Sequence, residues 1–222
     1  MASKIQPSPL GTPESSRPSQ IDPYFDALLR YFSQPCDNAR IEHPDPRIDS
    51  DILQRDSLRA AAVLIAVTRP RLDAHSRVVL TLRSEHLKSH AGQVSLPGGT
   101  CDAGDRDAID TALREAEEEV GLQRDRVEVI GCMGEIALPS GFRITPVVGL
   151  IDDGLGLTPC PDEVADIFHP PLSLLLEPSA YARSTAHYRG ADRTILELPF
   201  EGYRIWGATA AILHSLARKL RD

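Results

Sequence analysis

The sequence predicts an α/β fold, an α/β/α sandwich in which helices cover both faces of a mixed central sheet. Two observations lead to this class. Short apolar runs of strand length alternate along the chain with longer segments of helical periodicity. The chain also has 222 residues with 41% hydrophobic and 25% charged content, which is typical of globular proteins and enough for one sizeable core. We therefore expect one main domain with short additions.

The N-terminal part of the chain divides into two segments. Residues 1–20 are rich in Pro and Ser and contain no apolar run, which suits a flexible tail and excludes a secretory signal there. From Ile21 to Phe32, apolar and polar residues alternate at helical spacing, so we expect a helix packed on the domain. These patterns predict a tail (1–20), an N-terminal helical extension (21–58) and a main domain (59–222).

Segments 62–68 and 77–83 are apolar and short, and we interpret them as strands separated by a polar loop. The run from Leu96 to Leu122 follows, and it predicts a double-glycine turn that leads into a helix ending at Gly121. One stripe of this helix is built from small and aliphatic residues that can pack closely on a sheet. They are Ala108, Ile109, Ala112, Leu113, Ala116 and Val120.

The second half of the chain predicts the remaining elements of the sandwich. Segments 127–138 and 144–151 form a second predicted strand pair, joined through residues 139–141. Segment 163–175 starts extended and turns helical past its two prolines. The last elements are a hairpin around Glu201 and Gly202 and a closing helix, and their segments are 193–198, 203–206 and 208–220.

The helix after the glycines concentrates carboxylates on one strip. Glu115, Glu118 and Glu119 are spaced i, i+3 and i+4, so they fall within an arc of about 100°. Mg²⁺ and Mn²⁺ prefer such carboxylate oxygens, although a solvated acidic helix accounts for the spacing equally well. Gly98 and Gly99 favour a metal, because their backbone can approach a ligand closely and expose a carbonyl oxygen.

The helix ends in the run REAEEEVGL, from Arg114 to Leu122, which resembles the core of the Nudix box, R-E-U-x-E-E-x-G-U, where U is aliphatic. Every fixed position of that core matches. Upstream, the positions of the box's usual glycine and glutamate hold Thr100 and Arg106. One extra residue after Gly99 restores the glycine and brings Asp105 or Asp102 near the missing glutamate. A box longer by one residue is typical of the coenzyme A pyrophosphatase branch of the Nudix family.

A second signature of that branch precedes the box. The stretch VLTLRSEHLKSHAGQVSLPGG, which begins at Val79, is similar to the branch pattern L-L-T-x-R-[SA]-x3-R-x3-G-x3-F-P-G-G. Lys88 and Leu96 replace the arginine and the phenylalanine of the pattern, and lysine keeps the charge of arginine but loses its bidentate fork. The matching residues are Leu80, Thr81, Arg83, Ser84, Gly92, Pro97, Gly98 and Gly99.

The resemblance implies metal-dependent hydrolysis of the diphosphate of coenzyme A or acyl-coenzyme A to 3′,5′-ADP and 4′-phosphopantetheine or its acylated form. It implies Mg²⁺ or Mn²⁺ held by Glu115, Glu118, Glu119 and the carbonyl of Gly99. The implied catalytic residues are Glu115, Glu118, Glu119 and Glu163, and the one that acts as base is left open. The implied substrate-binding residues are Arg83, Lys88, His90, Gly92, Pro97 and Gly98.

Two other functions remain open at this stage. The same chemistry on another nucleoside diphosphate, such as ADP-ribose, is compatible with the Lys88 and Leu96 replacements. A non-catalytic nucleotide sensor on the same fold is the second alternative, and the complete carboxylate strip argues against it. A zinc site is disfavoured, because no third ligand follows His86 and His90 at a spacing typical of zinc sites.

Composition narrows the partners. The net charge of −8 argues against a nucleic-acid backbone, and four cysteines without a C-x-x-C pair predict neither a zinc site nor a disulfide framework. No stretch approaches the roughly 18 apolar residues of a membrane span. We therefore expect a small-molecule substrate and a cytoplasmic location, and the resemblance is compatible with a homodimer.

Overall fold

The computed structural model describes residues 22–34, 58–71, 75–87, 89–138, 140–188 and 191–221. The predicted tail, most of the predicted extension after residue 34, and Lys88 lie outside the described residues. The helices are α1 (Pro23–Phe32), α3 (Ala108–Val120), η1 (Arg124–Arg126), α4 (Leu172–Leu175), η2 (Pro178–Ala180) and α5 (Gly207–Lys219). The strands are β1 (Arg59–Thr68), β2 (Leu80–Arg83), β3 (Val94–Ser95), β4 (Gly98–Thr100), β5 (Glu128–Cys132), β6 (Ile136–Ala137), β7 (Phe142–Ile151), β8 (Val164–Phe168), β9 (Ala182–Tyr188), β10 (Ala191–Phe200) and β11 (Tyr203–Trp206).

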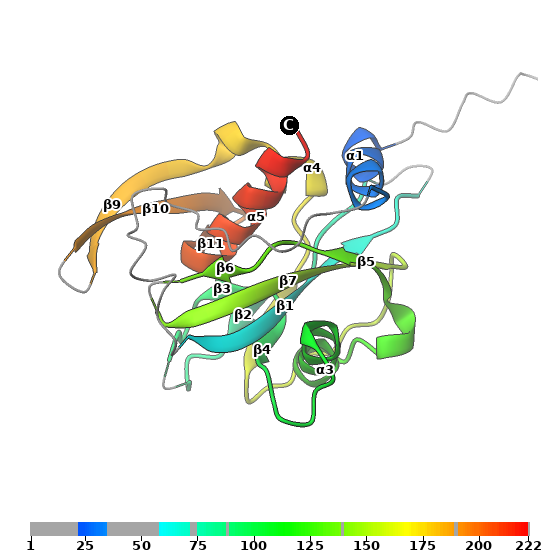
Figure 1. Ribbon diagram of the computed structural model, residues 1–222, viewed down its shortest axis with the longest axis horizontal. Helices are drawn as coiled ribbons and strands as arrows, with labels where there is room; N and C mark the ends of the chain where they lie inside the picture. The colour runs from blue at the N-terminus through cyan, green and yellow to red at the C-terminus, as the bar shows by residue number, and fades with distance from the viewer. Residues whose placement is uncertain are drawn as a thin grey trace, which may run out of the picture.

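The central sheet has the strand order β4-β1-β7-β5, and β6 also pairs with β7. Strands β1 and β7 run parallel along their whole length, whereas β4, β5 and β6 are antiparallel to their neighbours. Helix α3 covers one face of this sheet, and α1, α4 and α5 lie on the opposite side (Figure 1). The predicted α/β/α sandwich with a mixed central sheet is therefore confirmed.

Strand β1 is buried on both faces, which explains its continuous apolar sequence. Ala62 and Leu64 pack toward the stripe of α3, where Ala112 and Ala116 are fully buried. Ile65 points to the other layer, with the apolar residues of α5. The small-residue stripe that the sequence predicts on the helix is the surface that lets α3 approach the sheet.

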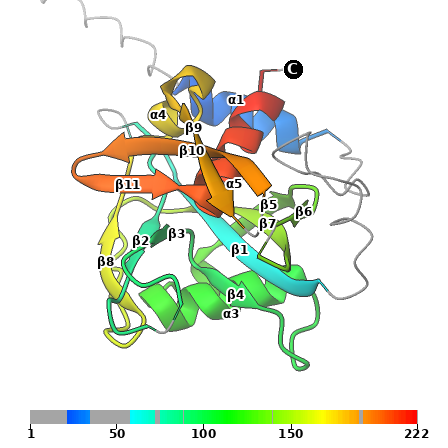
Figure 2. The ribbon, with the colours of Figure 1, turned by 90° about the vertical axis from the view of Figure 1, so that its left-hand side faces the viewer.

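Two smaller antiparallel sheets complete the fold, with the orders β3-β2-β8 and β11-β10-β9. Figure 2 shows the first of them between β11 and α3. Thr209 of α5 donates its hydroxyl hydrogen to the carbonyl of Val94 at 3.0 Å, which joins the closing helix to β3. Strand β3 leads directly into β4, so the second layer supports the glycine strand next to α3.

Helix α1 is tied to the domain through its N-cap. The Oδ1 atom of Asp22 accepts the N–H groups of Tyr24 and Phe25, as an N-cap carboxylate does. Its Oδ2 atom accepts the N–H of Ser76 at 2.9 Å, from the segment that precedes β2. Phe25 and Leu28 are buried in the main core, so capping and burial together fix the helix.

Several predicted elements are confirmed, two expectations are wrong, and one strand was not predicted. The helices expected at 21–32 and 208–220, the extended-then-helical segment 163–175 and the hairpin around Glu201 all form. The predicted double-glycine turn is a strand, because Gly98 and Gly99 pair with β1 in β4. Strand β9 was missed, because Ala182 to Thr185 are exposed and show no apolar alternation.

The strand predicted over 127–138 is two strands, β5 and β6. Pairing is interrupted because Pro146 in the facing strand β7 has no N–H to donate to the segment between β5 and β6. The pairing with β7 stops at Cys132 opposite Val147, and the N–H of Met133 donates to the carbonyl of Pro146 at 2.8 Å. Pairing resumes at Ile136.

We expect Asp22→Ala to lower the free energy of unfolding by about 2 kcal/mol, because it removes the helix cap and leaves the buried N–H of Ser76 without an acceptor. Urea unfolding followed by circular dichroism measures the change. Asp26→Ala, in the first turn of the same helix, is the matched control and should cost far less. Equal stability of the Asp22 variant and the wild type would contradict this anchor.

Candidate active site

Helix α3 presents its three candidate glutamates at three depths. The side chain of Glu118 is 59% exposed, that of Glu115 16% and that of Glu119 2%. The helix is fixed at both ends, since the Asp107 side chain accepts the N–H of Asp110 at 2.8 Å and Gly121 takes a left-handed conformation with φ of 67°. The strip therefore runs from solvent into the protein interior.

Glu119 is a buried carboxylate with little compensation. Its Oε2 atom accepts the N–H of Gly98 at 3.1 Å, and its Oε1 atom lies 3.5 Å from Nη1 of Arg83. Burial raises the pKa of Glu119 to about 7, and the Gly98 N–H and the Arg83 charge offset only part of that effect. This site can accept a further positive charge.

Both glycines of β4 lie very close to neighbouring groups. A Cβ at Gly99 would lie 2.5 Å from the carboxylate of Glu115, and a Cβ at Gly98 would collide with the backbone carbonyl of Ala62 in β1. The backbone contact requires glycine at position 98, whereas a Cβ at position 99 would displace the flexible side chain of Glu115. The Gly99 backbone thus lies directly beside a candidate metal ligand.

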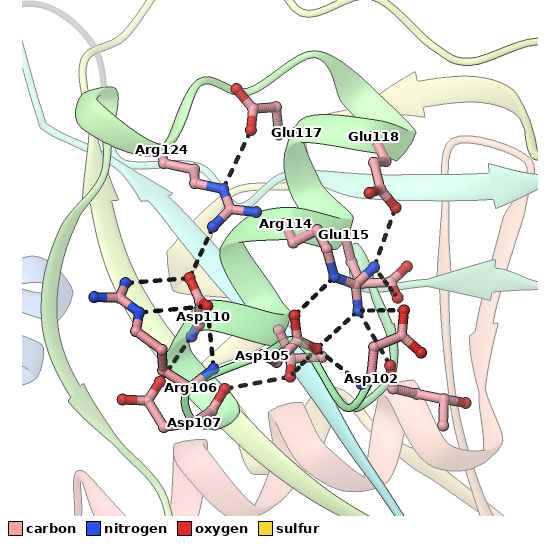
Figure 3. Close-up of polar contacts among 12 residues, drawn as sticks. Asp102, Asp105, Arg106, Asp107, Asp110, Arg114, Glu115, Glu117, Glu118 and Arg124 are labelled. Atoms are coloured by element: carbon pink, nitrogen blue, oxygen red, sulfur yellow. Dashed lines mark hydrogen bonds and ion pairs between the residues drawn. The ribbon is translucent and has the colours of Figure 1, made fainter.

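Arg114 is the centre of the polar network around the strip (Figure 3). Its Nε and Nη2 atoms donate to the two oxygens of Asp105 at 2.9 and 3.0 Å. Its Nη1 atom donates to Glu115 at 2.9 Å and to Glu118 at 3.1 Å, and Nη2 also donates to the carbonyl of Thr100. One arginine therefore offsets the repulsion between neighbouring carboxylates of the helix.

The sequence left open whether Asp105 or Asp102 takes the place of the missing glutamate of the box. The structure favours Asp105. The side chain of Asp105 is 6% exposed, and its bonds to Arg114 hold its pKa well below the usual range. Asp102 is an exposed partner at 3.7 Å. Arg106, at the usual place of the glutamate, pairs instead with Asp110 at 3.2 Å. Spacing along the helix places Glu118 at i+4 from Arg114, whereas Asp105 and Thr100 become its neighbours only through the fold of the loop.

Glu163 approaches the strip from the start of β8. The N–H of Cys160 donates to the carbonyl of Glu119 at 2.8 Å, and the N–H of Glu163 donates to the carbonyl of Cys160 at 3.0 Å. The charge of Glu163 raises the pKa of both Glu115 and Glu119, after the larger effect of burial. Four carboxylates from α3 and β8 thus act on one another electrostatically.

The donors around the strip fit a hard divalent cation. All are oxygens, and the buried Glu119 lacks full compensation. Within the described residues, no three His, Cys, Asp or Glu side chains are already gathered as metal ligands. Arg114 and Arg83 contact the glutamates of the strip, so binding of Mg²⁺ or Mn²⁺ requires the glutamates to give up these contacts.

Other candidate residues lie in separate places. His90 and Gly92 are in the loop that joins β2 to β3, where both have positive φ and the Nδ1 of His90 contacts the Oε1 of Gln93 at 2.9 Å. Pro97 is buried, and its carbonyl accepts the N–H of Leu64. Arg143, a cation of β7, pairs with Glu135 at 3.4 Å.

Comparison with known proteins agrees with this geometry. A family model described as NUDIX domain matches residues 58–188. A Photorhabdus laumondii protein named "Uncharacterized Nudix hydrolase NudL" is 41% identical over 167 residues, covering 75% of this chain and 87% of that protein. The protein of the same name from Escherichia coli K12 is 39% identical over 194 residues, covering 86% of this chain and 98% of the relative. Among solved structures, the Nudix hydrolase RenU from M. smegmatis is similar in fold, with a TM-score of 0.50, 21% identity and coverage of 72% of this chain and 84% of its own.

The raised pKa of Glu119 predicts how the stability of the metal-free protein depends on pH. The folded state holds this proton more tightly than the unfolded state, so stability is highest below the unfolded value of 4.5 and falls as the pH rises toward about 7. At ~1.4 kcal/mol per pKa unit the penalty at pH 8 is about 3 kcal/mol. Glu119→Gln should remove it, so the variant gains on the wild type between pH 5 and 8 in urea unfolding with EDTA. The exposed Glu117→Gln is the control, and parallel curves for all three proteins would contradict the expectation.

The anchor of Arg114 predicts an indirect effect on metal affinity. Asp105→Asn removes the charge that holds Arg114, so the guanidinium competes more strongly for Glu115 and Glu118. We expect the Kd for Mn²⁺ to rise roughly tenfold, as for other residues that position metal ligands. Electron paramagnetic resonance of free Mn²⁺ measures it. Asp102→Asn should leave the Kd nearly unchanged, and equal effects of the two variants would refute the assignment to Asp105.

Proposed function

The chain belongs to the Nudix hydrolase family, and on that premise we propose that it hydrolyses the diphosphate bond of coenzyme A or acyl-coenzyme A. The products would be 3′,5′-ADP and 4′-phosphopantetheine or its acylated form. The observation that carries the hydrolytic part is the carboxylate strip of α3 beside the glycine strand β4, with Glu119 buried and under-compensated. The coenzyme A part rests on the signature around Arg83 and Gly92, which precedes the strip in the sequence.

We assign Glu115, Glu118, Glu119 and the carbonyl of Gly99 to hold Mg²⁺ or Mn²⁺. When bound, such an ion supplies positive charge against the diphosphate oxygens and favours attack by water. The protein contributes the arrangement of these oxygens: β4 brings its backbone against Glu115, and Arg114 keeps Glu115 and Glu118 on the same strip. Water attack then needs a nearby carboxylate that can take a proton.

Glu118 and Glu163 are the candidates for that base. Both side chains are exposed, but Glu118 is held by Arg114 at 3.1 Å. Among the described residues the carboxylate of Glu163 has no hydrogen bond or ion pair, and its backbone is fixed through Cys160. A carboxylate that is positioned but unpaired is free to accept a proton from water, which favours Glu163.

The substrate contacts that we propose lie on the side of β2. Arg83 lies 3.5 Å from Glu119 and, unlike Arg114, is not anchored by an aspartate outside the strip, and its planar fork suits a phosphate. The loop after it, with His90 and Gly92, would meet the part of the substrate beyond the diphosphate. Lys88 belongs to the same proposal and lies outside the described residues. Pro97 and Gly98 shape the backbone of this side, since Pro97 binds β1 and Gly98 binds Glu119.

Another nucleoside diphosphate remains the second candidate substrate, and the Lys88 and Leu96 replacements in the signature favour it.

Among the described residues, no helix has the length and apolar character that a bilayer span requires. The cytoplasmic location and the homodimer stay predictions.

We expect the purified protein with Mg²⁺ or Mn²⁺ to release 3′,5′-ADP from coenzyme A or acetyl-coenzyme A faster than it cleaves ADP-ribose, NADH or diadenosine polyphosphates. Chromatographic analysis of the products measures this. Glu118→Gln and Glu119→Gln should abolish cleavage, because each removes a charge from the strip. Faster cleavage of another substrate would keep the hydrolase and reject coenzyme A. Tight nucleotide binding without any cleavage would favour the sensor.

A further inference from the structure

Two arginines compensate the acidic strip, and they are held in different ways. Arg114 is anchored away from the strip by both oxygens of Asp105 and by the carbonyl of Thr100. Only its Nη1 atom contacts the glutamates. Its position therefore does not depend on Glu115 or Glu118, and it can lose those contacts without moving away.

Arg83 has no such anchor. In the described part of the chain its guanidinium has one polar partner, the Oε1 atom of Glu119 at 3.5 Å, which is the long limit of a hydrogen bond. Its Nε atom is buried and has no hydrogen-bond partner. The side chain is 23% exposed, so it is neither a surface arginine nor one fixed in the core. A buried donor without an acceptor carries a free-energy cost that a suitable ligand would remove.

Glu119 explains why Arg83 lies there. The carboxylate is 2% exposed, and besides Arg83 its described partner is the single N–H of Gly98. A buried anion without a cation is unfavourable, so a positive charge is needed beside Glu119 whether or not a metal is bound. The guanidinium and a divalent cation would therefore compete for the same carboxylate.

We propose that Arg83 is the resident counter-ion of Glu119 in the metal-free protein and that a divalent cation displaces it, which releases its guanidinium to bind a phosphate of the substrate. This inference rests on the proposed function of the strip as a metal site. It gives Arg83 two successive partners, and it couples metal binding to phosphate binding through one side chain. The planar fork of arginine suits both partners, because each is a group of equivalent oxygens.

The proposal predicts opposite effects on two ligands. Removing the charge of Arg83 takes away a competitor of the metal, so Mn²⁺ should bind more tightly. The same change takes away a phosphate contact, so nucleotide should bind more weakly. A residue that only contacts phosphate would leave metal binding unchanged, and a residue that only supports the fold would weaken both.

The test is titration of Arg83→Gln with Mn²⁺ at pH 8 in the absence of nucleotide, followed by electron paramagnetic resonance. We expect the Kd for Mn²⁺ to fall on the order of tenfold relative to the wild type, within the usual range of coupling between sites. Arg204→Gln is the matched control, because Arg204 is an exposed arginine paired with Glu197 at 2.9 Å in the sheet of β9 to β11. Binding of 3′,5′-ADP in the presence of Mg²⁺ should weaken on the order of tenfold in the Arg83 variant only.

A second measurement does not depend on the glutamine variant being well folded. In the wild type, addition of Mg²⁺ should move the arginine Nε–H resonance of Arg83, identified by its loss in Arg83→Lys, while that of Arg114 stays in place. An unchanged Kd for Mn²⁺ in Arg83→Gln, an equal change in Arg204→Gln, or a static Arg83 resonance would overturn the proposal. The Mn²⁺ titration and the resonance measurement contain no nucleotide, so their result is independent of which diphosphate the enzyme cleaves.

Discussion

Concentrating negative charge at the edge of a buried helix face is the constraint on which the rest of this site depends. Glu115, Glu118 and Glu119 repel one another at i, i+3 and i+4 spacing, and Glu119 is also out of contact with water. The structure meets this cost with two arginines and a backbone N–H. It also brings the backbone of Gly99 close to the carboxylate of Glu115, while Gly98 lies against the backbone of β1. The arrangement of charged and backbone groups around the strip therefore compensates the negative charge of the glutamates. Hydrophobic packing alone would not require this arrangement.

Much of the fold follows from local sequence. Periodicity locates α1, α3 and α5, and Gly121 also marks the end of α3. The elements that were missed are those whose cause lies elsewhere in the chain. Pro146 lies in β7, but it interrupts the facing segment, which therefore forms β5 and β6 instead of one strand. Gly98 becomes a strand residue because it pairs with the edge of β1. The exposed β9 has no apolar signal, since its pairing with β10 is made by the backbone.

The candidate site divides in the same way. The spacing of residues within α3 is a local property, so the acidic strip was predictable. The choice between Asp105 and Asp102 was not, because it depends on how the loop before α3 folds back over Arg114. The ion pair between Arg143 and Glu135 was not predictable either, because it depends on the register of β6 against β7. Nothing local marks Cys160 as the link between α3 and β8.

That link has a consequence for how the protein can change over evolution. The connection from Glu119 through Cys160 to Glu163 is made entirely by main-chain N–H and carbonyl groups. The side chain at position 160 is therefore free to drift, whereas the length of the loop before it is not. An insertion or deletion between β7 and β8 would displace Glu163 from the strip even if every residue of both motifs were kept. Loop length in this segment is thus as informative as residue identity when homologous sequences are compared.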